Sequence, residues 1–229
     1  NKNIGFGHRR LSIIDLSSKG KQPMHYQNCT ITFNGEIYNY LEIKSDLIRK
    51  GYVFHSDTDT EVILASYKEF GESCVNYFDG MFAFTIWDND KQILFGARDR
   101  FGEKPFFYYK DKSQFSFASE MKALFSIDIP KIPSKSMIYN YLVYDVVENP
   151  HDKTETFYEG IYEIPPSNSF TLKLDGTFNI SKYWDIELTN QLEITQKEAT
   201  EKFYTLFNDS IKKRMRSDVE VGSSFSGGL

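Results

Sequence analysis

The sequence predicts an α+β fold in which two antiparallel β-sheets are stacked and helices flank them. Continuous apolar runs at 80–87 and 92–97 are typical of buried strands, and an Asp-Asn-Asp turn joins them. Two stretches with apolar residues at helical spacing, from about residue 40 and from about residue 59, each end at a glycine. The 229 residues include 20 Phe and 15 Tyr, which are enough to fill a core between sheets.

The N-terminal third begins with a predicted strand over 4–15, a polar loop over 19–27 and a second strand over 30–33. The motif FNGEIYN follows at 33–39 and leads into the first helix, where Asn39 and Glu42 have the spacing of a capping box. A short strand at 52–54 precedes the second helix. Thr58 and Glu61 repeat the capping-box spacing at its start, and Gly71 ends it.

The remaining elements alternate between hairpins and helices. After the strands at 80–87 and 92–97, we expect a hairpin of 106–109 with 114–118 and helices at 120–125 and 136–144. A strand over 169–174 ends at an Asp-Gly hairpin turn. An amphipathic helix is predicted over 196–216, and a strand over 218–221 opens into GSSFSGGL at 222–229.

Composition argues against several classes of function. The net charge is −5 with both signs interspersed, which argues against nucleic-acid binding, and no apolar run approaches the roughly 20 residues that span a bilayer. Cys29, Cys74 and the four histidines lack metal-ligand spacing, so we expect no metal site and a reduced, cytoplasmic setting. Both ends of the sequence look internal, so we expect a fragment of a longer chain.

The organising motif offers the parts of an oxyanion hole. Gly35 allows backbone N–H groups to approach a ligand closely, and Asn34 adds an amide donor beside them. An ordinary Asn-Gly turn between a strand and a helix would also explain the pair.

Two charged residues could bind the ends of an α-amino acid. Arg10, in the middle of the first predicted strand, can hold a carboxylate through two parallel hydrogen bonds, although a surface ion pair is the alternative. If Thr58 caps the second helix, the carboxylate of Asp59 is free to accept from an ammonium group. Alternatively, Asp59 only complements the positive helix end.

The C-terminal Ser/Gly motif could form a phosphate cradle, because a strand that opens into Ser-Gly-Gly presents N–H groups to an anion. A flexible tail has the same composition.

Together these motifs resemble the glutamine-hydrolysing asparagine synthetases, in order and in spacing, across the whole chain. The resemblance rests on GHRRLSI at 7–13, FNGEIYN at 33–39, SDTDTE at 56–61 and SGGL at 226–229. Arg98, Asp99, Gly102, Lys104 and Pro105, with SEMKAL at 119–124, look like further motifs of the same family.

The resemblance implies a four-layer αββα N-terminal-nucleophile hydrolase fold over residues 1–186, the class II glutamine amidotransferase domain. A linker at 187–195 would precede residues 196–229, the first helix and strand of an α/β ATP pyrophosphatase-type synthetase domain. In the family, glutamine is hydrolysed at the first site and ammonia passes through a tunnel to aspartate that ATP has activated as an acyl adenylate. Glutamine, aspartate and ATP are thus the implied small-molecule partners, ATP and Mg the implied cofactors of the full-length protein, and a homodimer is compatible.

Motif by motif, the resemblance assigns the oxyanion hole to Asn34 and Gly35. The implied glutamine site consists of Arg10, Leu11, Ser12, Ile13, Ile14, Asn34, Gly35, Glu36 and Asp59. The implied ATP site includes Ser224, Ser226, Gly227 and Gly228.

The sequence departs from the family at the nucleophile, which is an N-terminal Cys whose α-amine acts as base. Cys29 lies within a strand and has no free α-amine, so we expect both cysteines to be structural and the fragment to be inactive and to hold no cofactor. Two alternatives stay open: a related amidotransferase with another acceptor, in β-lactam or surface-polysaccharide synthesis, and a non-catalytic glutamine-binding module.

Overall fold

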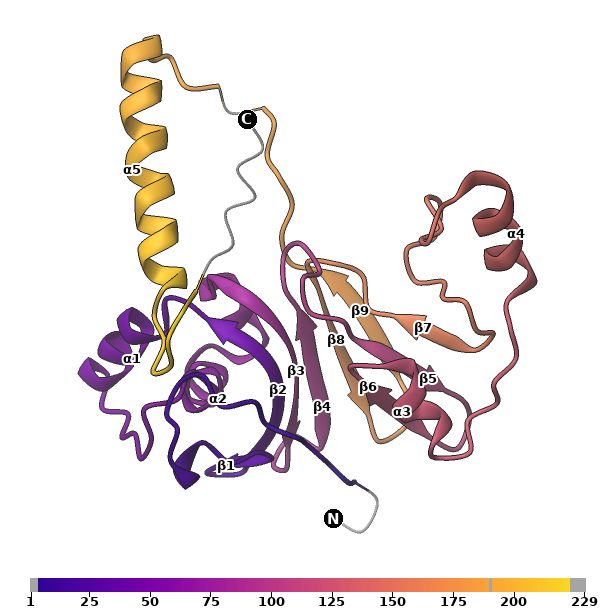
Figure 1. The fold of residues 1–229 in the computed structure, drawn as a ribbon. Helices are drawn as coiled ribbons and strands as arrows, with labels where there is room; N and C mark the ends of the chain where they lie inside the picture. Colours follow the sequence, from indigo (N-terminus) through magenta and orange to yellow (C-terminus); the bar gives the residue numbers. More distant parts are fainter. Residues whose placement is uncertain (1–3, 190, 223–229) are drawn as a thin grey trace.

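The computed structural model describes residues 4–189 and 191–222. In this part of the chain the strands form two antiparallel sheets (Figure 1). The larger has the order β1-β2-β3-β4-β8-β9, with bounds Met24–Tyr26, Cys29–Ile37, Gly80–Asp88, Ile93–Arg98, Asn168–Lys173 and Phe178–Lys182. The smaller has the order β6-β5-β7, with bounds Phe115–Ala118, Phe107–Lys110 and Ile161–Glu163.

Strand β3 shows why the sheets are stacked. Its side chains alternate between two cores, as the pleat requires. Phe82, Phe84 and Ile86 pack with helices α1 (Tyr40–Arg49) and α2 (Asp59–Phe70), whereas Ala83 and Trp87 join the core between the sheets. The prediction of a buried strand at 80–87 is therefore confirmed, and the strand is buried on both faces.

The outer face of the smaller sheet is covered by α3 (Met121–Phe125), which buries Leu124 against Ile161 of β7. The layers run helix, sheet, sheet, helix, as predicted. Helix α4 (Lys135–Tyr144) follows α3 in the chain and buries Met137.

Helix α5 (Gln196–Arg214) extends away from both sheets, and only its C-terminal end approaches α1 (Figure 1). Thr195 and Glu198 form a complete capping box. The predicted apolar face (Phe203, Leu206, Phe207, Ile211 and Met215) is exposed, between 44% and 68%. The domain boundaries at 186 and 196 stay a prediction. No described helix combines the length and apolar composition that crossing a membrane requires.

Several predicted elements are wrong. Residues 4–15, 52–54 and 218–221 form no strand, whereas β1 lies in the predicted polar loop. In the first segment the carbonyls have other partners. Those of Ile14 and Asp15 accept from the nearby Arg10 side chain, and that of Ile13 accepts from the N–H of Asp218, which is distant in sequence. Carbonyls held in this way are not free to pair with a neighbouring strand.

The two predicted capping boxes have different outcomes. Thr58 caps α2 and accepts from the N–H of Glu61, as predicted, although the Glu61 carboxylate binds the N–H groups of His55 and Ser56 instead. The box at Asn39 is wrong, because its side chain accepts from the Asp79 N–H and donates to the Tyr77 carbonyl.

Candidate functional site

A cavity of about 170 Å³ lies where segment 8–14, β2 and the start of α2 meet. Every predicted glutamine-site residue except Ser12 lines it: Arg10, Leu11, Ile13, Ile14, Asn34, Gly35, Glu36 and Asp59. Residues from three separate motifs are therefore brought together, although segment 8–14 lacks the predicted strand conformation. The structure also adds Gln22, Thr60, Met81 and Lys104, which sequence reasoning did not assign to the site.

Asn34 and Gly35 lie inside β2, which continues past the predicted strand end at residue 33 to Ile37, so the alternative of an ordinary Asn-Gly turn is wrong. Asn34 pairs with Ala83 and Gly35 with Phe82 of β3. Gly35 has a φ of +147°, and an added Cβ would lie 2.1 Å from the Met81 carbonyl oxygen. The glycine is therefore required by the close approach of two strands rather than by a turn.

The Asn34 side chain borders a second cavity, of about 410 Å³, between the two sheets. Residues directly opposite in an antiparallel pair share a face, and Ala83 faces the core between the sheets. The Asn34 amide donates to Ser119 Oγ over 3.4 Å, and both residues line this cavity together with Thr85. The Thr85 hydroxyl is buried and has no hydrogen-bond partner among the described residues. Asn34 therefore lines both cavities, and the second cavity is also lined by the hydroxyl-bearing residues Thr85 and Ser119.

Asp59 is the first residue of α2 and is only 5% exposed. Its Oδ2 accepts from the Ile37 N–H at 3.0 Å. Burial raises the pKa of its carboxyl to about 7, against the lowering effect of the Ile37 and Thr60 N–H groups. Because Thr58 provides the helix cap, the Asp59 carboxylate remains available to a cation in the cavity.

The Arg10 guanidinium is fixed by carbonyl groups. Its Nη2 donates to Ile14 O at 2.5 Å and to Asp15 O at 2.8 Å, and Nη1 donates to Ser17 O at 3.4 Å. Gly20 lies against this group, since an added Cβ would come within 2.4 Å of Arg10 Cζ. The alternative of a surface ion pair is not supported in the described chain, where no carboxylate lies within ion-pair distance of Arg10. Its Nε–H and one Nη1–H remain for a ligand.

Lys104 reaches the same cavity from a loop that Arg98 and Asp99 organise. The buried Asp99 carboxylate accepts from four N–H groups, those of Phe82, Phe101, Glu103 and Lys104. Arg98 donates to the carbonyls of Gly102, Lys104 and Ile164. Burial raises the pKa of Glu36, and the nearby Lys104 charge opposes this shift. The site therefore contains charges of both signs.

Neither cysteine belongs to the site. Cys29 and Cys74 are buried in the core beneath α1 and α2, and burial raises the pKa of both thiols, that of Cys29 to about 11. Cys29 lies five residues from Asn34 on β2, a separation of roughly 16 Å along a strand. Both features fit a structural role.

A scan against family models matches residues 1–184 to the glutamine amidotransferase domain. The chain belongs to this family. It is 38% identical over its whole length to asparagine synthetase [glutamine-hydrolyzing] 1 of Bacillus subtilis and covers 35% of that protein. It is also 31% identical over its whole length to amidase chry2 of Gibberella zeae, of which it covers 34%. The chain thus spans about a third of the length of these relatives.

Among solved structures, glutamine phosphoribosylpyrophosphate amidotransferase from B. subtilis matches 77% of the chain, with a TM-score of 0.55 and 17% identity, and the chain covers 34% of it. This likeness confirms the predicted N-terminal-nucleophile fold. The predicted ATP-site residues Ser224, Ser226, Gly227 and Gly228 lie outside the described residues.

Proposed function

We propose that this chain is the glutamine-binding part of a glutamine-hydrolysing asparagine synthetase. The observation that carries the proposal is the 170 Å³ cavity lined by both Arg10 and Asp59. A half-buried cation and a buried carboxylate in one small cavity suit an amino acid, which carries one charge of each sign on its α-carbon. Both ends of such a ligand would be paired, and only a paired charge is tolerated in a buried site.

In the proposed complex, the remaining N–H groups of Arg10 hold the α-carboxylate of glutamine. Asp59 accepts from the α-ammonium group, and this cation holds the Asp59 carboxyl ionised despite its burial. The side-chain amide of glutamine then extends toward Asn34 and Gly35. There the Asn34 amide and the Gly35 N–H would stabilise the negative oxygen of the tetrahedral intermediate.

The nucleophile is proposed to come from the whole protein rather than from a cysteine of this chain. Cys29 and Cys74 are buried thiols with raised pKa values, and a buried neutral thiol is a poor nucleophile. The family resemblance supplies an N-terminal cysteine whose α-amine is the base. Its attack on the glutamine amide carbon would release ammonia, and water would then release glutamate.

The second half of the proposed reaction transfers this ammonia to aspartate. ATP with Mg would supply the acyl adenylate on which ammonia displaces AMP, giving asparagine, AMP and pyrophosphate. The similarity to asparagine synthetases over the whole chain supports this acceptor. The similarity to a fungal amidase favours the second candidate, an amidotransferase with the same glutamine site and another acceptor.

Ammonia release by the whole protein tests the proposal. Glutamine would be supplied with and without ATP and aspartate, and ammonia, asparagine and AMP would be measured. Asparagine and AMP formed together with glutamate would support the synthetase. Glutamate and ammonia without asparagine under all conditions would favour the second candidate. No hydrolysis of glutamine would overturn both.

A further inference from the structure

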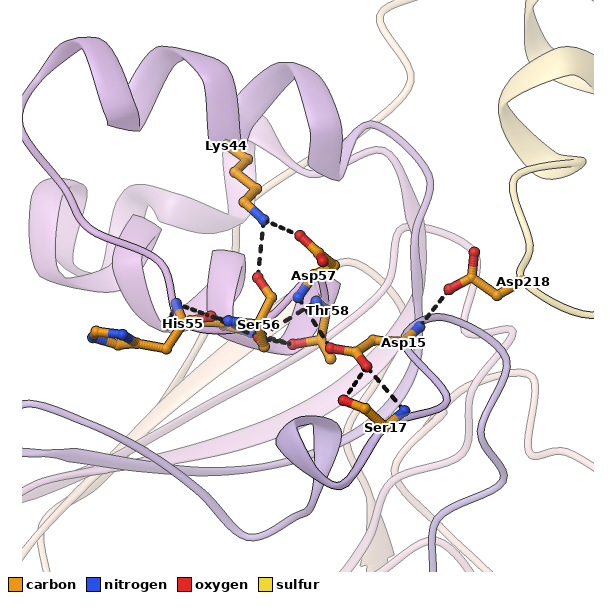
Figure 2. Close-up of polar contacts among 9 residues, drawn as sticks. Asp15, Ser17, Lys44, His55, Ser56, Asp57, Thr58 and Asp218 are labelled. Carbon is orange, nitrogen blue, oxygen red and sulfur yellow. Dashed lines mark hydrogen bonds and ion pairs between the residues drawn. The ribbon is translucent and has the colours of Figure 1, made fainter.

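Asp15 lies next to the cavity residue Ile14 and contacts three separate segments of the chain (Figure 2). Its backbone has a φ of +53°, the left-handed conformation that non-glycine residues seldom adopt. Its Oδ1 accepts from Ser17 N at 3.0 Å and Ser17 Oγ at 2.5 Å, and its Oδ2 accepts from the Asp57 N–H at 3.0 Å. The carboxylate therefore joins two loops distant in sequence.

These two loops carry the two charged groups of the glutamine site. On one side, the Asp15 carbonyl accepts from Arg10 Nη2, and the Ser17 carbonyl accepts from Arg10 Nη1. On the other side, Asp57 directly precedes Thr58, the residue that caps α2 at Asp59. Asp15 thus connects the position of Arg10 to the start of the helix that carries Asp59.

The third segment is the C-terminal one. Asp218 Oδ2 accepts from the Asp15 N–H at 2.7 Å (Figure 2). The Asp218 N–H also donates to the Ile13 carbonyl at 3.0 Å. Nearby, Arg216 donates to the Tyr38 carbonyl and to both oxygens of Glu42. Residues 216–218 are therefore hydrogen-bonded both to the loop that contacts the Arg10 side chain and to Tyr38, directly after β2.

We propose that Asp15 is a positioning residue that sets the separation of Arg10 and Asp59, and that Asp218 couples this separation to the C-terminal segment. The inference rests on the proposed function. Neither residue lines the cavity, so each acts through other residues. In sequence, Asp218 lies between α5 and the Ser/Gly motif of the predicted ATP site. A movement of the segment that contains Asp218 would break or keep its hydrogen bond to the Asp15 N–H, and would in this way change the separation of Arg10 and Asp59.

The decisive test is a double-mutant cycle on glutamine affinity in the 229-residue chain, measured by isothermal titration. Asp15→Asn keeps a residue that tolerates the left-handed backbone, but it replaces one acceptor oxygen with an NH₂ that faces an N–H donor. We expect about tenfold weaker binding of glutamine. In the Arg10→Lys background, the same change should have less than about twofold effect, because residues that act through one another are not additive. A merely structural role would give equal losses in both backgrounds.

The coupling has its own variant and control. Asp218 is exposed, and Asp218→Ala removes the carboxylate that accepts from the Asp15 N–H. This change should weaken glutamine binding about threefold. Glu220→Ala removes another exposed carboxylate from the same segment and should leave affinity unchanged. Equal affinities for the two variants would overturn the coupling, and this arm decides the inference if Asp15→Asn does not fold. If wild-type chain binds no glutamine, the proposed function fails instead.

Discussion

Replacing Asp59 with asparagine is expected to stabilise the protein and to weaken its binding of glutamine. The carboxyl is 5% exposed, and its pKa is raised from 3.8 to about 7. Such a rise in pKa corresponds to roughly 4 kcal/mol of preference of the folded protein for the uncharged Asp59 carboxyl. The asparagine oxygen can still accept from the Ile37 N–H, so the native hydrogen bond survives while the buried charge is removed.

The sign of the pH dependence follows from the raised pKa. Between pH 4 and pH 7 the folded state binds more protons at Asp59 than the unfolded state, so wild-type stability falls as the pH rises. We therefore expect Asp59→Asn to raise the unfolding free energy by roughly 2–4 kcal/mol at pH 8, and by progressively less toward pH 5. Urea unfolding at several pH values measures this difference.

Asp57→Asn is the matched control, because the Asp57 side chain is 90% exposed and pairs with Lys44 at the surface. Its effect on unfolding should stay within about 0.5 kcal/mol at every pH. Glutamine affinity should fall roughly 10–100-fold in Asp59→Asn, because a charge-assisted hydrogen bond to the α-ammonium group is lost. In the Asp57→Asn control it should stay unchanged. An Asp59→Asn protein that is less stable than wild type at pH 8 would refute the reasoning.

Four further predictions concern the same site. Arg10→Lys should weaken glutamine binding by more than about tenfold in titration calorimetry, since one ammonium cannot both donate to the three carbonyl groups and bind the ligand; equal affinity would remove Arg10 from the site. Gly20→Ala should displace the Arg10 guanidinium and weaken binding about tenfold, whereas Gly5→Ala, which has open space around it, should not. In the whole protein, Asn34→Ala should lower kcat for ammonia release by about 10²–10³ with little change in KM, and a change in KM alone would contradict the oxyanion role. Glutamine affinity should fall as the pH drops below about 7, because Asp59 becomes protonated, and a flat profile would contradict its ionic role.

Local signals predicted the parts of the fold that depend on neighbouring residues. The bounds of α2 follow from the Thr58 cap and from Gly71, and β3 was recognised by its apolar run. The strand predicted over 4–15 was wrong because its carbonyls are held by the Arg10 side chain and by Asp218, about 200 residues away in sequence. Neither the side-chain bonds of Arg10 nor the long-range bond of Asp218 leaves a periodic pattern in the sequence.

The candidate site shows the same division. The resemblance selected residues from three motifs that the fold brings around one cavity, and Ser12 was the exception. The sequence placed Lys104 in a family motif but not in the glutamine site. Its position near Glu36 depends on the loop that Asp99 organises through four backbone N–H groups, and this fold of the loop has no local sequence pattern. Asp15 was seen only as the end of a strand, since its partners Asp57 and Asp218 are far away in sequence.

The central claim is that Arg10 and Asp59 each hold one charged group of glutamine. Its most direct test is calorimetric titration with glutamine, with 4-carbamoylbutanoate, which lacks the α-amine, and with 4-aminobutanamide, which lacks the α-carboxylate. Wild-type chain should bind both analogues at least about tenfold more weakly than glutamine. In Asp59→Asn the penalty for losing the amine should disappear, while the penalty for losing the carboxylate remains. Wild-type chain that binds 4-carbamoylbutanoate as tightly as glutamine would contradict the account.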